Sequence, residues 1–408
     1  MTLKIHNTLS GELEEFKPLV PSKVGMYNCG PTVYDYAHIG NLRAYVSADI
    51  MRRTLEYVGY EVKQVVNITD IGHLTSDANV GDDKMVKGLK RENLPLTLEG
   101  LSKLADKYEK AFKDDMKALN IETPHELPRA TMCLPSEIEL VEKLVEKGYT
   151  YETKEGIYFD TSKFPDYGKL GGLTPIDESL TRVGGEDKKN PRDFVLWKFS
   201  SDEKLSFPSP WGAGFPGWHI ECSAMSRRYL GQPFDIHTGG TDHIPIHHNN
   251  EIAQSEAAHN KSLANYWLHV AFLNMDGEKM AKSAGTFLTL NELVDKGHSP
   301  LAYRYLLLQS HYRTPTTFTW ESLEASSKAL EKLQKLVASL LAPSGVEGPE
   351  GGSVDLAYKA KFVEKLENDF NTPQALAIVW TLAKDKEVKL EDKRTTLLDF
   401  DKVLGLGL

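Results

Sequence analysis

Two cysteines far apart in the sequence, Cys29 and Cys222, are accompanied by the polar run His247-His248-Asn249-Asn250-Glu251. Thiolate, imidazole and carboxylate groups are the ligands that proteins offer to zinc, usually four to one ion. His247 and Glu251 are four residues apart, a spacing that puts both side chains on one face of a helix. Because no Cys-x-x-Cys pair marks the site, spacing alone favours two buried cysteines and a polar helix surface. Other motifs must decide whether a metal site exists.

A second chemical pattern is the segment Tyr36-Ala37-His38-Ile39-Gly40-Asn41, which follows a predicted strand and opens a predicted helix. A helix N-terminus offers free backbone N–H groups and the positive end of a dipole, and both favour phosphate. His38 adds a donor for phosphate oxygens, and Gly40 lets a nucleotide approach the backbone closely. The segment indicates a nucleotide site, although an ordinary strand-to-helix turn has the same form.

Two lysines lie in the segment Glu278-Lys279-Met280-Ala281-Lys282-Ser283, between Asp276-Gly277 and Ala284-Gly285. Lysines in a short loop can follow the negative charge that develops on a leaving pyrophosphate. Electrostatic stabilisation of this kind is often the largest single contribution to catalysis. A Lys-x-x-Lys pair taken alone is also common in solvated basic turns.

A fourth pattern, His237-Thr238-Gly239-Gly240-Thr241-Asp242, closes another predicted strand. The two glycines allow close contact with a base or ribose. Asp242 can accept hydrogen bonds from ribose hydroxyls. A simple turn is the alternative explanation for any Gly-Gly pair.

The elements that must position these motifs alternate between strand and helix. Strand signals at residues 24–28 and 62–68 flank a helical pattern at 41–58, which predicts a βαβ unit and a parallel sheet. Strand signals return at 234–237 and 267–273. Ligands bind at the carboxyl ends of parallel strands. We therefore expect Cys29, after the first strand, to converge there with Cys222, which we assign to the returning sheet pattern.

Between and after these strands, the sequence predicts further helices and one hairpin. We expect helices at 97–119 and from Ser136, with Glu139 as its capping-box partner, to Gly148. A hairpin is expected at 149–152 and 157–160, in an insertion that runs to about residue 200. From residue 321 we expect a helix, a loop at 342–352 and two further helical segments.

Composition limits the class of protein. With 408 residues and 40% apolar residues, the chain suits a globular protein of two to three domains. No apolar run approaches the roughly 18 residues of a membrane span, and residues 1–15 do not resemble a signal peptide. Three cysteines predict the reducing cytoplasm, with Cys133 as a buried packing thiol. The net charge of −10 argues against wholesale nucleic-acid coating.

Taken together and in their order, the motifs resemble those of cysteinyl-tRNA synthetase, a class I aminoacyl-tRNA synthetase, over essentially the whole chain. The resemblance also rests on Cys29-Gly30-Pro31-Thr32-Val33-Tyr34, Gly217-Trp218-His219-Ile220-Glu221-Cys222 and Asp369-Phe370-Asn371-Thr372-Pro373. It implies an α/β fold, in which a Rossmann-type parallel-sheet catalytic domain carries an α+β insertion and is followed by a C-terminal helical bundle. The implied parts are the first catalytic half (1–120), the connective insertion (121–205), the second catalytic half (206–275), the lysine "KMSKS" loop with a stem-contact segment (276–320) and the tRNA-binding bundle (321–408).

The resemblance also implies roles for individual residues. One zinc ion per chain would be held by Cys29, Cys222, His247 and Glu251. The other implied roles are catalysis by His38, Asn41, Lys279 and Lys282, nucleotide binding by Gly40, Gly239, Gly240, Asp242 and Lys282, and cysteine binding by Thr69, Trp218 and His237.

The implied substrates are L-cysteine, ATP with Mg²⁺, and tRNA(Cys), and the implied form is a cytoplasmic monomer with no membrane contact. Zinc would separate cysteine from serine, because a hydroxyl is a harder and poorer ligand for this ion than a thiolate. An apolar pocket alone rejects a near-isostere poorly. With zinc providing the selectivity, we expect no editing site.

Two departures from the family pattern bear on this resemblance. Asn249 replaces an acidic residue often found at its place, and the chain ends soon after Val403-Leu404-Gly405-Leu406, where bacterial members typically continue. We therefore expect a short form without the usual C-terminal anticodon-contacting segment. One alternative is the related cysteine ligase of mycothiol synthesis, which joins cysteine to an amino-sugar. Another is a non-catalytic tRNA-binding paralogue, against which the presence of both lysines and all four metal-type ligands argues.

Overall fold

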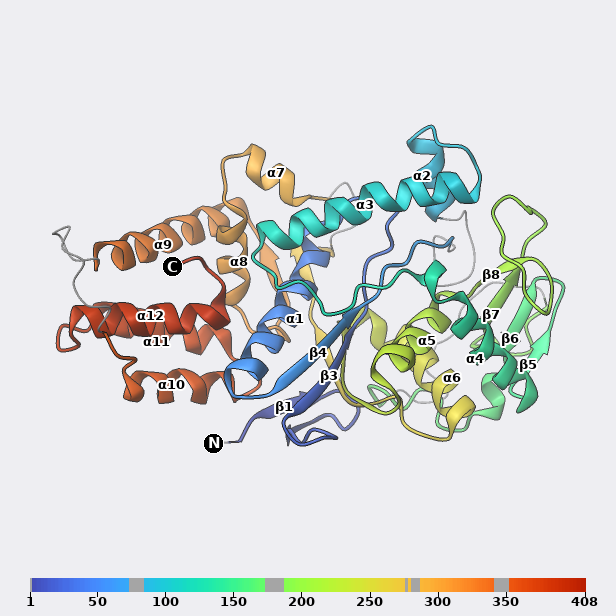
Figure 1. Cartoon of the computed structure of the whole chain (residues 1–408), viewed down its shortest axis with the longest axis horizontal. Helices are drawn as coiled ribbons and strands as arrows, with labels where there is room; N and C mark the ends of the chain where they lie inside the picture. Colours follow the sequence, from blue (N-terminus) through green and yellow to red (C-terminus); the bar gives the residue numbers. More distant parts are fainter. Residues whose placement is uncertain (1, 73–83, 173–186, 276–277, 280–286, 341–351) are drawn as a thin grey trace.

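A four-stranded parallel sheet lies at the centre of the molecule (Figure 1). The computed structural model describes residues 2–72, 84–172, 187–275, 278–279, 287–340 and 352–408. The sheet has the order β10–β9–β3–β4. Its strands are β3 (Lys23–Asn28), β4 (Glu61–Val66), β9 (Phe234–Gly240) and β10 (Ala264–Val270). All four strands were predicted from the sequence, and the fold is α/β as expected.

The sheet has a topological switch point between β3 and β9. From β3 the chain passes through helix α1 (Ile39–Tyr57) to β4 on one side, and from β9 it passes through helix α6 (Asn249–His259) to β10 on the other. The two central strands pair in parallel, with Asn28 opposite Thr238. Ligands bind outside the carboxyl ends of strands at such a point. Cys29 and the Gly239–Gly240 pair both lie there.

Helices cover both faces of this sheet. On one face α1 packs against residues that alternate along the strands, among them Val24, Met26 and Leu268. On the other face α5 (Trp218–Leu230) and α6 pack against Tyr27 and Trp267. The period of two along β3 follows from the pleat, which points successive side chains to opposite faces. Helix α3 (Leu98–Ala118), expected at 97–119 and capped by the Thr97 side chain, packs beside α1 through Phe112 and Tyr45.

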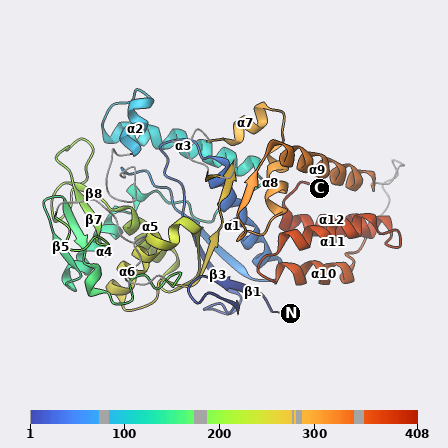
Figure 2. The same ribbon diagram turned by 180° about the vertical axis from the view of Figure 1, so that it is seen from behind.

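A four-stranded antiparallel sheet lies at the end of the molecule opposite the helical bundle (Figures 1 and 2), and its fourth strand lies beyond residue 205, where the insertion was expected to end. Its strands are β5 (Thr150–Glu152), β6 (Gly156–Phe159), β7 (Phe194–Phe199) and β8 (Gly214–Pro216). The predicted hairpin is β5–β6. The predicted capping box at Ser136 is wrong, because α4 (Leu134–Glu146) begins two residues earlier with Pro135 in its first turn and has no side-chain cap. Proline suits the first turn because its missing N–H would have no partner there.

The C-terminal third is helical, apart from a small sheet. That sheet has the order β12–β11–β13. Its strands are β11 (Leu273–Met275), β12 (Glu278–Lys279) and β13 (Thr316–Phe318), and the helices are α7 (Leu290–Asp295), α8 (Pro300–Leu308), α9 (Trp320–Ser339), α10 (Leu356–Leu366), α11 (Thr372–Lys384) and α12 (Leu390–Leu404). Three helices therefore follow residue 352, where two were expected. A turn at Asp369 and Phe370, both with left-handed backbone angles, divides α10 from α11.

Two short elements complete the described chain: the hairpin β1 (Lys4–Asn7) and β2 (Glu12–Glu15), and helix α2 (Lys84–Arg91). Most of the predicted loop at 342–352 lies outside the described residues. Among the described residues, no helix is both long and apolar enough to cross a membrane.

Candidate functional site

An open cleft of about 1580 Å³ lies at the carboxyl ends of β3 and β9. It is lined by most of the segment from Cys29 to Asn41, including His38 and Gly40. The predicted residues Trp218, Gly239, Gly240 and Asp242 line it as well. The switch point of the sheet thus brings together motifs that are some 200 residues apart in the sequence.

The four predicted metal ligands lie together at the base of this cleft. One donor atom each from Cys29, Cys222, His247 and Glu251 falls within 4.8 Å of all the others. The two sulfur atoms are 4.0 Å apart, Cys29 Sγ is 3.9 Å from Glu251 Oε1, and His247 Nε2 is 3.1 Å from the same oxygen. Two thiols, an imidazole and a carboxylate in this arrangement suit tetrahedral zinc.

The cluster is assembled from three elements. Cys29 follows β3, and His247 lies in a π-helical turn (Ile244–His248) that leads directly into α6, on which Glu251 lies. Cys222 lies within helix α5. Our assignment of Cys222 to the returning sheet pattern is therefore wrong. Its neighbours from His219 to Ser226 are all buried, so no polar face marks the segment as a helix in the sequence.

Neighbouring side chains orient the ligands. His247 Nδ1 lies 2.9 Å from His219 Nδ1, whereas its buried Nε2 has no partner in hydrogen-bond geometry and faces the cluster. The second carboxylate oxygen of Glu251 lies 2.8 Å from His237 Nε2. Such outer contacts fix ring and carboxylate orientation in metal sites. An orphaned buried nitrogen among two thiols and a carboxylate fits a bound zinc ion.

The charges in the cluster are strongly coupled. Burial opposes the ionisation of Glu251, but the charge and hydrogen bond of His237 and the nearby His247 outweigh it and lower the carboxyl pKa to about 2. Burial likewise opposes a protonated His247, yet the close approach of Cys222 and Glu251 raises its pKa to about 10. A hydrogen bond with Cys29 lowers the pKa of the Cys222 thiol. Burial raises the pKa of the Cys29 thiol well above its usual range.

A second, overlapping donor set contains Cys29, His237, His248 and Glu251. His248 Nε2 is 3.4 Å from Cys29 Sγ, and its other nitrogen is 2.8 Å from His269 Nε2. Burial lowers the pKa of His248 well below its usual value, so its ring is neutral. His269 had no signal in the sequence, because it lies on an apolar strand and meets His248 only through the fold.

The segment from Tyr36 to Asn41, in which a nucleotide site was predicted, forms the N-terminal end of α1. His38 caps the helix, with Nδ1 accepting from the backbone N–H of Asn41 at 3.2 Å. The Asn41 side chain accepts in return from the His38 N–H. Asn41 therefore serves as the capping-box partner of His38. Gly40 lines the cleft beside them.

The two glycines that end β9 are needed for close packing. A Cβ atom on Gly239 would lie 2.5 Å from His243 Nδ1, and one on Gly240 would lie 2.3 Å from Asp242 Oδ1. At Gly239 the buried His248 ring also lies 2.7 Å from that Cβ position and excludes a side chain, whereas at Gly240 the exposed Asp242 carboxylate would have to turn away.

The predicted cysteine-binding residues are divided between the cleft and its base. Trp218 lines the cleft, whereas Thr69 and His237 are buried. Thr69 Oγ1 donates to Glu221 Oε2 at 2.7 Å, and the His237 ring stacks on Trp267 with centroids 4.5 Å apart. Sequence reasoning missed Lys84, which lines the same cleft with Nζ 5.0 Å from the centroid of a Trp218 ring.

The lysine motif is described only in part. Lys279 lies in β12, opposite Asn274 of β11. Lys282 and Ala281 lie outside the described residues. Cys133 is fully buried in the core, and burial raises the pKa of its thiol to about 11, as suits a packing role.

Comparison with known proteins identifies the family of the chain. Residues 15–328 match the family model of the class I (C) tRNA synthetase catalytic domain, and residues 361–408 match the DALR domain. Cysteine–tRNA ligase 1 of Burkholderia lata is 48% identical over 100% of this chain and 85% of its own. The cysteine–tRNA ligase of Treponema denticola is 44% identical over 100% and 87%, and that of Pyrococcus horikoshii 43% over 94% and 79%.

The chain belongs to the cysteine–tRNA ligase family. Solved structures of other synthetases share the fold of this family at low sequence identity. Mycobacterium tuberculosis methionyl-tRNA synthetase in complex with methionyl-adenylate has a TM-score of 0.62 at 16% identity, over 94% of this chain and 90% of its own. The Agrobacterium radiobacter LeuRS–tRNA–LeuAMS complex has a TM-score of 0.64 at 12% identity, over 96% and 84%.

Proposed function

We propose that this protein activates L-cysteine with ATP to form cysteinyl-adenylate and pyrophosphate, and then transfers cysteine to the 3′ end of tRNA(Cys). We propose further that a zinc ion held by Cys29, Cys222, His247 and Glu251 selects cysteine through its thiolate. The observation that carries the proposal is the convergence of these four donors within 4.8 Å at the base of the cleft.

Bound zinc would supply a Lewis acid that prefers a thiolate to a hydroxyl, and so would separate cysteine from serine. The side chains of the protein orient and enclose the substrates. Trp218 lines the cleft above the metal-type cluster, while His237 holds the outer oxygen of Glu251. Catalysis then rests on holding the cysteine carboxylate in line with the α-phosphate of Mg-ATP, and on cations that stabilise the departing pyrophosphate. In this proposal His38 and Asn41 act at the phosphates, and Lys279 and Lys282 at the leaving group.

The first test is cysteine-dependent ATP–pyrophosphate exchange, together with zinc content, in a pair of alanine variants. Cys222→Ala removes a proposed ligand and should lose both zinc and exchange. Cys133→Ala removes another buried cysteine that lies outside the cluster and should keep both. If both variants keep their exchange activity, zinc-based selection is contradicted. Activation of serine at a rate close to that of cysteine would contradict it as well.

The second test separates the tRNA ligase from the amino-sugar ligase. Similarity to cysteine–tRNA ligases over the whole chain favours tRNA as the acceptor. Ester formation on tRNA(Cys) should therefore proceed, whereas amide formation on glucosaminyl-inositol should not. The opposite result would favour the amino-sugar ligase. Comparison of full-length tRNA with an acceptor-stem minihelix then measures anticodon reading, because equal rates would mean that the anticodon is ignored.

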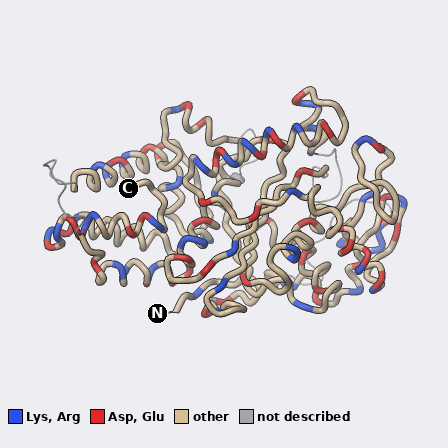
Figure 3. The backbone as a smooth tube through the Cα atoms, viewed as in Figure 1, with Lys and Arg blue, Asp and Glu red and all other residues tan. Residues whose placement is uncertain are grey.

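We assign tRNA contact to the helical bundle of residues 321–408, and we propose a cytoplasmic monomer. Lys and Arg alternate with Asp and Glu along the helices of this bundle (Figure 3), so tRNA contact would rest on local groups of cations. Such binding weakens as salt rises, with a slope set by the number of phosphate contacts. The salt dependence of tRNA binding and the mass in solution by light scattering test these two points.

A further inference from the structure

The turn that divides α10 from α11 is built into the catalytic domain. Phe370 packs in the same apolar cluster as Val24 and Met26 of the parallel sheet. The turn also pairs with β1, because Lys4 N–H donates to Glu367 O at 2.8 Å and Asp369 N–H donates to Lys4 O at 2.9 Å. This part of the bundle therefore docks on the catalytic domain through both core packing and backbone hydrogen bonds.

Asp369 and Phe370 adopt left-handed backbone angles, with φ of 59° and 54°. Left-handed geometry costs roughly 1–2 kcal/mol for a residue with a Cβ atom. Asp tolerates it better than most residues, whereas Phe has no such advantage. Strained residues of this kind persist where the surrounding contacts over-determine them. Two in succession indicate that the position of the Asp369 side chain is under strong constraint.

The Asp369 carboxylate binds the segment of residues 309–315 that joins α8 to β13, here called the connection. One oxygen accepts from Tyr312 OH at 2.8 Å and from the backbone N–H of His6 at 3.0 Å. The other accepts from Arg313 Nε at 2.7 Å. The Asp369 carbonyl lies 2.8 Å from His311 Nε2. Three consecutive residues of the connection are thus bound to one buried residue of the bundle.

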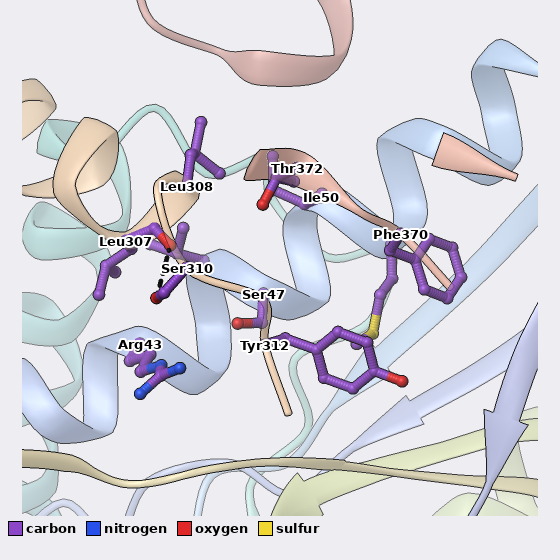
Figure 4. Close-up of a pocket in the computed structure, with 11 residues that line it drawn as sticks. Arg43, Ser47, Ile50, Leu307, Leu308, Ser310, Tyr312, Phe370 and Thr372 are labelled. Atoms are coloured by element: carbon purple, nitrogen blue, oxygen red, sulfur yellow. Dashed lines mark hydrogen bonds between the residues drawn. The ribbon is translucent and has the colours of Figure 1, made fainter. Parts of the chain in front are cut away.

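The Arg43 side chain of α1 hydrogen-bonds to the same connection from the other side. Its guanidinium is buried without a carboxylate partner among the described residues, and it donates to Thr314 O at 2.7 Å and His311 O at 3.3 Å. It also donates to Phe272 O at 2.6 Å, at the start of β11. A cavity of about 330 Å³ separates the two sets of contacts, with Arg43, Ser310, Tyr312 and Phe370 around it (Figure 4).

The connection supports the strand that carries Lys279. Tyr312 O accepts from Ala271 N–H at 2.9 Å, and Thr316 N–H donates to Phe272 O at 3.1 Å. From there β11 pairs with β13, and β12 pairs with β11, with Lys279 opposite Asn274. Loss of the contacts made by Asp369 would free one side of the connection, and a shift of the connection would carry β11 and β12 with it through these backbone hydrogen bonds.

We propose that Asp369 is a positioning residue for adenylate formation, because it holds the connection on which β11 and β12, and hence Lys279, are built. The inference rests on the proposed function. A turn of the helical bundle would thus contribute to cysteine activation, the step that precedes transfer to tRNA. Loss of Asp369 should therefore slow cysteine activation in the absence of tRNA.

The test is cysteine-dependent ATP–pyrophosphate exchange by the full chain, with kcat normalised to active sites titrated by the adenylate burst. For Asp369→Asn we expect kcat per site to fall about 10-fold or more, since a displacement near 1 Å costs on that order. The KM for cysteine and the zinc content should stay at the wild-type values, because the metal-type cluster does not touch the connection. Normalisation removes any loss that comes from a smaller folded fraction.

The matched control is Asp399→Asn. Asp399 is a buried carboxylate of the same bundle that also reaches the catalytic domain, through Tyr57 OH of α1, and binds Lys402 Nζ at 2.8 Å. Within the described part of the chain its side chain contacts Tyr57, Lys359 and Lys402 but not the connection, so its kcat per site should stay within about twofold of wild type. If Asp369→Asn does not fold, Arg313→Ala, at a half-exposed side chain, and Tyr312→Phe carry the test with smaller losses of about 2- to 5-fold.

A kcat per site for Asp369→Asn equal to that of wild type, or an equal fall in Asp399→Asn, would overturn the inference. Normal exchange with slow tRNA charging would overturn it as well, because the turn would then act only through tRNA. A wild-type protein without cysteine-dependent exchange would instead refute the proposed function, so the two failures are distinguishable.

Discussion

Gly30 joins the first metal-type ligand to the rest of the cleft, and its replacement by alanine should release zinc. A Cβ atom at this position would lie 1.5 Å from the backbone oxygen of Asn67. The ends of β3 and β4 must therefore separate by about 1.5 Å before that contact reaches even 3.0 Å. The hydrogen bond from Gly30 N–H to Asn67 Oδ1, at 2.8 Å, would be lost with the same movement.

The displacement can be compared with the tolerance of a metal site. Zinc–ligand distances hold to about ±0.2 Å, and Cys29 precedes Gly30 directly. We therefore expect Gly30→Ala to weaken zinc binding by about 100-fold. This is the upper end of the effect of removing a residue that supports a metal ligand. Its free energy of unfolding should fall by about 3 kcal/mol from overpacking. The assay is zinc content after dialysis against a competing chelator, with exchange activity and chemical denaturation alongside.

Gly25→Ala provides a control on the same strand. A Cβ atom there would meet its nearest neighbours at 3.6 Å, an ordinary van der Waals contact, so zinc and exchange should both be retained. If Gly30→Ala holds zinc stoichiometrically and exchanges at the wild-type rate, the argument from backbone crowding is refuted.

Three further predictions concern ligand orientation, the bundle interface and pH. His219→Leu should weaken zinc binding by about 10- to 100-fold, because His247 Nδ1 loses its partner at 2.9 Å; competition with a chelator measures this, and unchanged affinity would contradict it. Arg304→Ala should destabilise the fold by about 3 kcal/mol, because Asp49 keeps only its pair with Arg53 and the buried carbonyl oxygens of Leu404 and Leu119 lose their donor. Lys110→Ala, from an exposed pair, should cost less than about 0.5 kcal/mol by the same denaturation assay. Burial, and secondarily Asp114, raise the pKa of Asp115 to about 7 from a usual 3.8. The folded state therefore holds this proton more tightly, and stability declines as pH rises from about 4 to 7. Asp115→Asn should raise the melting temperature at pH 8 and leave it unchanged near pH 4, and an equal effect at both pH values would refute the assignment.

The central sheet and its helices could be predicted because their patterns are local. Strand β3 alternates between two buried faces, and α1 follows a phosphate-type turn with its own capping residues, His38 and Asn41. The parallel pairing and the switch point follow from the order of the elements. The juxtaposition of Cys29 with Glu251 could then be expected from topology.

The parts that sequence reasoning missed depend on contacts between distant segments. Cys222 lies in a helix buried on all sides, so its periodicity was hidden. The break between α10 and α11 rests on two left-handed residues, Asp369 and Phe370, which only tertiary contacts hold in place. The pairing of His248 with His269 likewise joins α6 to β10 through space. The His248–His269 pair leaves no signal within one helix or strand, whereas the start of α11 does, because Asn371 caps it and Pro373 lies in its first turn.

The separation of the metal-type ligands along the chain has a consequence for biogenesis. Cys29 and Glu251 are 222 positions apart, and the whole antiparallel insertion is synthesised between them. A nascent chain cannot complete the donor set until the second crossover of the sheet has been made. Metal uptake should therefore follow the pairing of the two halves of the parallel sheet, and bound metal would report that these halves have come together.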